Sequence, residues 1–160
     1  SLGRTIDFGV GKPRTTMAIP WGDVSTAFHS TGIPDIEVYF PVPPGARTGA
    51  RALGLLAPIV ASRPVQSLLK RVVDTRPAGP SDEQRAKGAS FLWGEVKNAR
   101  GEVRVSRLRT PEGYTLTADA SLTILRKVLE GEFKPGYQTP SSAYGADLVM
   151  GLPGVSREDL

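Results

Sequence analysis

Apolar and polar positions along the first forty residues predict three short strands and one helix. Arg4–Phe8 and Thr16–Ile19 are typical of strands, and the glycine-containing turn Gly9–Pro13 lies between them. Asp35–Phe40 alternates between apolar and polar residues, which predicts a third strand. Between the second and third strands, Asp23–Thr31 has apolar residues at helical spacing. We expect Asp23 to cap the beginning of this helix and Gly32 to end it.

Two further helices are predicted in the middle of the chain. Arg47–Ala57 has a helical composition, and Pro58 interrupts it. Pro64–Val73 has the stripe of an amphipathic helix, with apolar residues at Val65, Leu68, Leu69, Val72 and Val73. After the linker Arg76–Asp82, Ser81 and Gln84 have the spacing of a capping box, which predicts a short helix that ends at Gly88.

The clearest local signal is a hairpin in the second half of the chain. Ala89–Lys97 and Glu102–Arg109 are strand-like and flank the turn Asn98–Gly101. Arg107 and Arg109 fall on one face of the second strand and Arg104 on the other, so strand alternation divides these basic residues. A solvated sheet edge is therefore favoured over a carboxylate or phosphate contact from Arg107 or Arg109.

A long helix follows the hairpin. The last strong helical pattern is Thr117–Glu130, with an apolar stripe that includes Leu122, Leu125 and Leu129. Phe133–Gly154 is then expected to be a loop followed by a short apolar segment.

Interleaved strands and helices with a hairpin predict an α+β fold. We expect a mixed, largely antiparallel sheet covered by helices on one face, and a single domain over residues 1–160. The 39% of hydrophobic residues is sufficient for a folded core. The chain begins with Ser1 rather than Met, which suggests a processed or excised piece of a longer protein.

Composition excludes several classes of site. The chain has no cysteine, so disulfides, thiolate catalysis and cysteine-based zinc sites are excluded. It has one histidine, which excludes a metal site with several histidines from one chain. The net charge of +4 is too small for a nucleic-acid-binding surface, so no nucleic acid partner is expected. No glycine-rich dinucleotide or phosphate-binding motif occurs, because Gly9-Val10-Gly11 lacks the third glycine.

Candidate site residues cluster around three stretches. Ser25 and His29 are four residues apart and share one helix face, but a catalytic serine–histidine pair also needs an orienting carboxylate, and Asp23 is better placed as a helix cap. A polar helix end that faces a ligand and a plain solvated helix face both remain open. Thr110–Ala118 and Tyr137–Gly145 are rich in hydroxyl groups and glycine, as in loops that line ligand pockets or in turns held by side chains.

Four segments, in chain order, resemble the C-terminal half of saccharopine dehydrogenase-like oxidoreductases, a group that includes saccharopine reductases and trans-acting enoyl reductases. They are IPWGDVSTAFHSTGIPDIEVY, FLWGEVKNARGE, TPEGYTLTA and KPGYQTPSSAYGADLV, and the resemblance extends from about Thr5 to Val155. It implies that the complete protein has an N-terminal Rossmann domain that binds NAD(P), while this chain is the substrate-binding and dimerisation domain. The partners it implies are that Rossmann domain, a second copy in a homodimer, and a small-molecule or lipidic substrate.

The resemblance carries expectations for individual residues. Asp23, Ser25, Tyr114, Gln138 and Tyr144 are the expected substrate-binding residues. His29 is the expected proton donor, because histidine is the side chain that ordinarily titrates near neutral pH. The chain alone is expected to be inactive, with no cofactor and no metal of its own. No signal peptide is visible, so a cytoplasmic location is expected.

The alternative is a non-catalytic module for self-association or for docking at a membrane surface. The apolar run Leu53–Val60 lies beside Arg63, Lys70 and Arg71, which could form a basic amphipathic pair of helices peripheral to a membrane. The simpler interpretation is two core helices that cover the sheet. The run is too short to span a bilayer.

Overall fold

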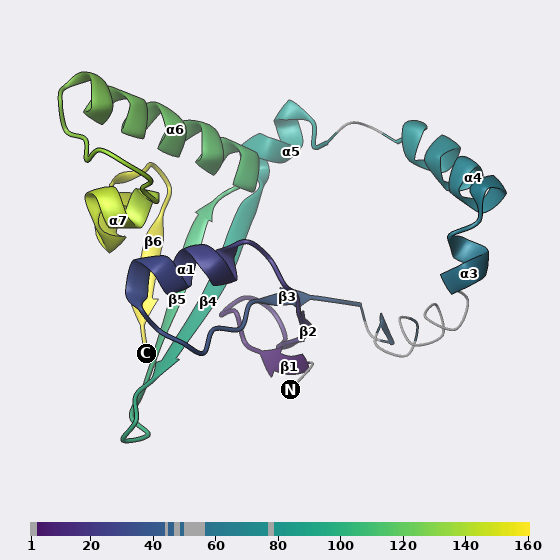
Figure 1. Cartoon of the computed structure of the whole chain (residues 1–160), viewed down its shortest axis with the longest axis horizontal. Coiled ribbons are helices and arrows are strands. Elements are labelled where there is room, and N and C mark those ends of the chain that lie inside the picture. Colours follow the sequence, from purple (N-terminus) through teal and green to yellow (C-terminus); the bar gives the residue numbers. More distant parts are fainter. Residues whose placement is uncertain (1–2, 44, 47–48, 50–56, 77–78) are drawn as a thin grey trace.

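The chain folds into two small antiparallel sheets and a set of helices (Figure 1). The structure is a computed structural model that describes residues 3–43, 45–46, 49, 57–76 and 79–160. The helix expected over Arg47–Ala57 lies almost entirely outside the described residues.

The first sheet contains β1 (Gly3–Ile6), β2 (Arg14–Ala18) and β3 (Tyr39–Pro41) in that order. Arg4 pairs with Thr16, and the fully buried hydroxyl of Thr16 donates to the Arg4 carbonyl at 2.7 Å. The third strand is shorter than the predicted Asp35–Phe40, since residues 35–38 have no strand conformation. They run beside a helix instead, with the hydrogen bond from Ile19 N–H to the Val38 carbonyl as their link to the sheet.

The second sheet contains the predicted hairpin, β4 (Ala89–Lys97) and β5 (Val103–Pro111), and a third strand, β6 (Ser156–Asp159). The side chain of Asn98 accepts hydrogen bonds from the backbone N–H groups of Arg100 and Glu102, both at 3.0 Å, which fixes the turn. β6 was not anticipated, because Ser-Arg-Glu-Asp lacks apolar alternation. Arg157 holds it to the preceding segment through an ion pair with Asp147 at 2.9 Å.

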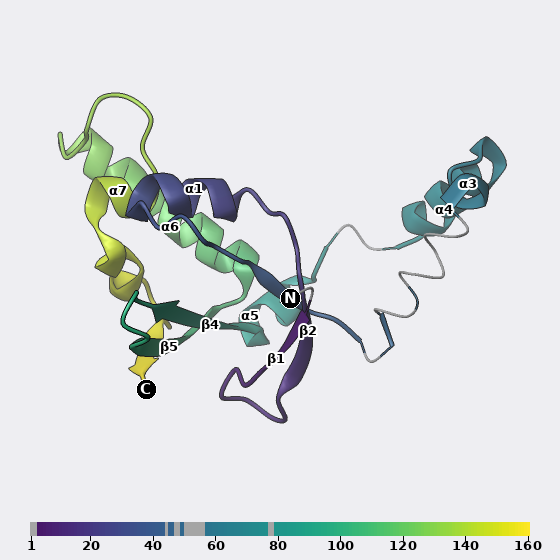
Figure 2. The same ribbon diagram turned by 60° about the horizontal axis from the view of Figure 1, so that its bottom comes forward.

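The main helices are α1 (Asp23–Thr31), α4 (Arg63–Asp74), α5 (Asp82–Lys87) and α6 (Gly113–Leu129). The shorter ones are α3 (Ala57–Val60), α7 (Pro140–Tyr144) and the 3-10 helix η1 (Ala146–Gly151). Figure 2 shows α1, α6 and α7 on the same side of the β4–β5 hairpin. The α+β class is therefore confirmed, but the expected single mixed sheet is replaced by two separate sheets, whose described strand pairs are all antiparallel.

Two predicted apolar helix faces are not covered. α3 and α4 lie apart from both sheets in both views, so the simpler interpretation of core helices is wrong for this part of the chain. The apolar stripe of α6 is also open, because Leu122, Leu125 and Leu129 are all more than half exposed. Among the described helices, none has the length and apolar character needed to cross a membrane.

Very little apolar surface is buried. The buried apolar residues of the described part are Ile6 and Leu152. A compact monomer of 17.1 kDa would expose about 7,750 Å², and the 12212 Å² that this chain exposes is about 1.6 times larger. This excess indicates a fold with extensive surface left open on the isolated chain.

Two arginines connect the sheets. The Arg4 guanidinium on β1 donates to both carboxylate oxygens of Glu95 on β4, at 2.9 and 2.7 Å, and lies 4.6 Å from the ring centroid of Trp93. On the neighbouring strand, Arg107 binds the Asp7 carboxylate at 2.9 Å. The Arg107 side chain is thus engaged in an ion pair between the sheets, unlike the solvated edge residue that strand alternation suggested.

The Arg4–Glu95 pair makes stability depend on pH. Hydrogen bonds from Arg4 lower the pKa of Glu95 below its ordinary 4.5. Because the pKa is lowered by folding, the stabilisation is complete above pH 4.5 and is lost as the pH falls through the folded value. We expect Glu95→Gln to reduce the free energy of unfolding at pH 7 by about 0.5–1 kcal/mol, the range of partly exposed ion pairs.

The measurement is urea denaturation of wild type and variant between pH 7 and pH 3. The difference between the two proteins should shrink below pH 4.5. Glu83→Gln is the control, because it removes an exposed ion pair within α5, between Lys87 and Glu83. A difference in the free energy of unfolding that persists unchanged at low pH would contradict the role of the Arg4–Glu95 ion pair. An equally large effect of Glu83→Gln would contradict it too.

Candidate functional site

An open apolar groove of about 390 Å³ lies between α1 and the segment that precedes β3. Gly32 shapes it: at φ 70° its N–H donates to the Phe28 carbonyl at 2.8 Å, which ends α1 and turns the chain back along the helix. The groove is lined by Pro20, Trp21, Val24, Ser25, Phe28, Pro34 and Ile36. An apolar part of a ligand fits this lining better than a charged one.

One aromatic residue of the groove, Trp21, is held against the first sheet, and both Trp21 and Phe28 remain accessible. The Trp21 ring packs against Phe40 of β3, with 5.7 Å between the ring centroids. Trp21 is 54% exposed and Phe28 46% exposed, so each has apolar surface that a ligand or a partner could cover. Sequence reasoning missed these residues as a site, although the spacing Trp21, Val24, Phe28 was a visible helical stripe, because such stripes usually face a core.

Three of the expected site residues lie on α1. Ser25 is the hydroxyl-bearing side chain of the groove lining. His29 follows one turn later, and its ring has an edge contact with Phe28 at 5.5 Å between centroids. Within the described residues, no hydrogen bond joins Ser25 to His29 or either of them to a carboxylate.

The role of Asp23 at the start of α1 differs from the expected one. Gly22 occupies the cap position without a side-chain hydrogen bond, and Asp23 is the first residue inside the helix. The predicted aspartate cap is therefore wrong by one residue. Its carboxylate still suits the positive end of the helix dipole.

Gln138 lies near the end of α1. The hydroxyl groups of Ser30 and Thr139 are 3.0 Å apart, which places the segment before α7 against the last turn of α1. Thr139 and Ser142 form a capping box at the start of α7, and the Gln138 side chain accepts a hydrogen bond from the Ser142 hydroxyl at 3.1 Å. The structure therefore brings Gln138 into the neighbourhood of the α1 residues.

Tyr144 lies at the C-terminal end of α6. Its hydroxyl donates to the Glu132 carbonyl at 2.8 Å, and the Lys127 ammonium lies 5.5 Å from its ring centroid. A hydrogen bond with the Glu132 carboxylate raises the pKa of Lys127, which keeps the charge beside the ring. Tyr144 thus holds α7 to α6.

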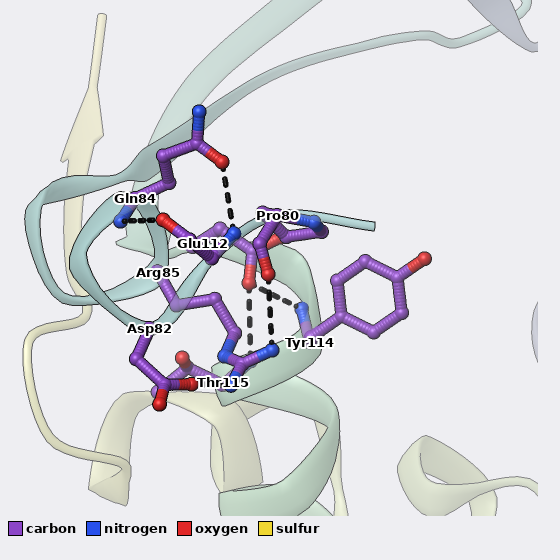
Figure 3. A network of polar contacts seen from close by, with 8 residues as sticks. Pro80, Asp82, Gln84, Arg85, Glu112, Tyr114 and Thr115 are labelled. Atoms are coloured by element: carbon purple, nitrogen blue, oxygen red, sulfur yellow. Dashed lines mark hydrogen bonds and ion pairs between the residues drawn. The ribbon is translucent and has the colours of Figure 1, made fainter. Parts of the chain in front are cut away.

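Tyr114 lies at the opposite end of α6, which is about 25 Å long at 1.5 Å per residue. Figure 3 shows its ring pointing away from the surrounding polar network. The six expected residues therefore do not form one cluster: four lie on or beside α1, and the two tyrosines mark the two ends of α6.

The stretch Thr110–Ala118 is not the expected loop. α6 begins at Gly113, because the Glu112 carboxylate accepts hydrogen bonds from the backbone N–H groups of Tyr114 and Thr115 (Figure 3). Sequence reasoning missed this start because glutamate is an uncommon cap. The adjacent capping box of Ser81 and Gln84 is confirmed and starts α5 beside it.

No family model, curated protein or solved structure matches the chain. The described residues also contain no group of three or more histidine, cysteine or acidic side chains that could hold a metal ion.

The junction of α5 and α6 makes a specific prediction at Gly88. A Cβ atom there would lie 2.8 Å from the Gln84 carbonyl oxygen and 2.9 Å from the Glu112 Cβ. Gly88→Ala should therefore displace the Glu112 cap and reduce the free energy of unfolding by about 1–3 kcal/mol, as overpacking does.

Gly94→Ala is the matched control, because a Cβ at Gly94 meets nothing within 4 Å. Urea denaturation of both variants is the measurement, and the control should be neutral or slightly stabilising. Equal stability of the Gly88 variant and the wild type would show that Glu112 does not need this close packing.

Proposed function

We propose that the chain is the substrate-binding and dimerisation domain of an NAD(P)-dependent oxidoreductase of the saccharopine dehydrogenase-like group. The apolar groove beside α1 carries this proposal. Its lining residues all fall within IPWGDVSTAFHSTGIPDIEVY, one of the segments that resemble the group, and Trp21 of the lining packs against Phe40 of the first sheet. A groove of this kind would hold the apolar part of a small or lipidic substrate.

The groove has one open side, which supports a role for a second domain. Its aromatic residues are about half exposed, and the chain as a whole exposes far more surface than a compact monomer of its mass. The open stripe of α6 adds apolar surface of the same kind. In the proposal, an N-terminal Rossmann domain and a second copy of the protein cover these surfaces.

The turn that contains Gly9 and Gly11 does not fit a dinucleotide by itself. Gly9 and Gly11 have positive φ angles of 77° and 67°, but their turn joins two antiparallel strands. A dinucleotide loop needs a strand followed by a helix N-terminus. Hydride transfer would therefore be chemistry of a cofactor held by the other domain, and this chain would bind the substrate and exclude water.

The polar residues beside the groove have assigned roles in this proposal. Ser25 would donate to or accept from a polar substrate group, and Asp23 and Gln138 would extend that polar rim along α1 and its end. His29 would supply a proton at the groove edge, one helical turn from Ser25. Tyr114 and Tyr144, at the ends of α6, would contact a substrate that extends beyond the groove.

The test begins with NADPH binding. Residues 1–160 should give no saturable heat on titration with NADPH or NADH, whereas the protein with its natural residues upstream of Ser1 should bind one of them. Tight binding by residues 1–160, or an upstream region without a glycine-rich strand–turn–helix, contradicts the proposal.

Two tryptophans then test the groove. If the groove faces the nicotinamide, excitation of Trp21 should transfer energy to NADPH bound by the longer protein, because transfer falls steeply with distance. Trp21→Phe should remove more of the sensitised NADPH emission than Trp93→Phe, since Trp93 lies under Arg4 between the sheets. An equal or larger loss from Trp93→Phe would place the cofactor elsewhere.

A further inference from the structure

α3 and α4 form a unit that stands apart from the rest of the fold (Figures 1 and 2). The corner between them is fixed by hydrogen bonds: the Ser62 hydroxyl donates to the Ile59 carbonyl at 2.6 Å, and the Gln66 amide donates to the Val60 carbonyl at 2.8 Å. The chain reaches this unit from β3 and leaves it toward α5. α4 is thus held in a defined orientation relative to α3.

The two faces of α4 are sharply different. At 100° per residue, its apolar side chains fall on one side of the helix, and these are Val65, Leu68, Leu69, Val72 and Val73. Leu68 is 62% exposed and Val73 is 64% exposed, so this face meets water on the isolated chain. An isolated helix of 12 residues with several β-branched side chains is marginal in water. A stable α4 therefore requires another apolar surface that covers this face.

The charges of this unit identify that surface. Residues 57–76 contain four cationic side chains, Arg63, Lys70, Arg71 and Arg76, against the single carboxylate of Asp74. This net charge of +3 accounts for most of the net +4 of the whole chain. Lys70 and Arg71 project near the two edges of the apolar face, where long cationic side chains can reach a plane of anionic groups while the apolar face lies below them.

A second copy of the chain fits this face less well. A helix of 12 residues is about 18 Å long, and with a width of about 10 Å its face offers about 180 Å². A stable protein interface needs about 800 Å² on each partner. Pairing two copies would also bring two units of like charge together.

We propose that α3 and α4 dock the protein on an anionic membrane surface, with α4 lying in the headgroup region and its apolar face toward the acyl chains. This arrangement matches an amphipathic helix with a basic polar face and low overall hydrophobicity, which lies on a membrane rather than across it. The docking is independent of the oxidoreductase proposal, since it needs no cofactor and no substrate.

The test is flotation of residues 1–160 with vesicles of phosphatidylcholine alone or with phosphatidylglycerol added. The protein should float with the anionic vesicles, and much less with the neutral ones or at high salt. Leu68→Glu with Val72→Glu should reduce flotation to background. Lys70→Glu with Arg71→Glu should weaken binding to anionic vesicles by more than about tenfold, because each basic residue near such a surface contributes about fivefold.

The matched control is Leu122→Glu with Leu125→Glu, which changes two similarly exposed leucines on α6 and should leave flotation unchanged. Circular dichroism of each variant checks that the fold is retained. The proposal is overturned if the wild-type protein does not float with the anionic vesicles. It is also overturned if the α6 control loses as much binding as the Leu68→Glu, Val72→Glu variant, or if that α4 variant binds fully. So does a lipid-free dimer of the wild type that the α4 variant abolishes, because a second copy would then cover the face.

Discussion

The placement of the two sheets relative to each other depends on two arginine–carboxylate ion pairs that connect them. Arg4 binds Glu95 with both guanidinium Nη atoms, and Arg107 binds Asp7 across the same junction. No large apolar core helps to hold the sheets together in the described part of the chain, where the buried apolar residues are Ile6 and Leu152. Ion pairs orient the sheets but cover little apolar surface, so they leave helix faces open that a larger core would have covered.

The open faces explain why the proposed functions all involve a second surface. The α1 groove, the leucine stripe of α6 and the apolar face of α4 lie on separate elements, and they differ in character. The groove combines aromatic walls with nearby hydroxyl groups, which suits a substrate-binding site that another domain completes. The α4 face combines aliphatic side chains with cations at its edges, which suits lipid. Different partners can therefore cover them without competition.

Local signals in the sequence predicted local structure well. The hairpin of β4 and β5, the α5 capping box and the end of α1 at Gly32 are all specified by neighbouring residues, and the structure confirms them. Two misses arose where non-local contacts decide: residues 35–38 leave the first sheet, with Ile36 in the groove lining, and β6 pairs through its backbone. A third miss was local, because the uncommon cap residue Glu112 starts α6 four residues early. Helical periodicity marked the apolar faces of α4 and α6 but could not show that both are open, since a stripe is the same whether the fold or a partner covers it. The roles expected for His29, Ser25 and the other site residues stay predictions.

The central proposal is that the surface beside α1 is covered by another domain of a longer natural protein. Hydrogen–deuterium exchange of residues 1–160 alone, compared with the protein that includes its natural upstream residues, tests it most directly. We expect the amides of α1 and of the segment up to β3 to exchange more slowly in the longer protein, while those of α4 exchange at the same rate in both. Identical exchange of α1 in the two proteins would contradict the account.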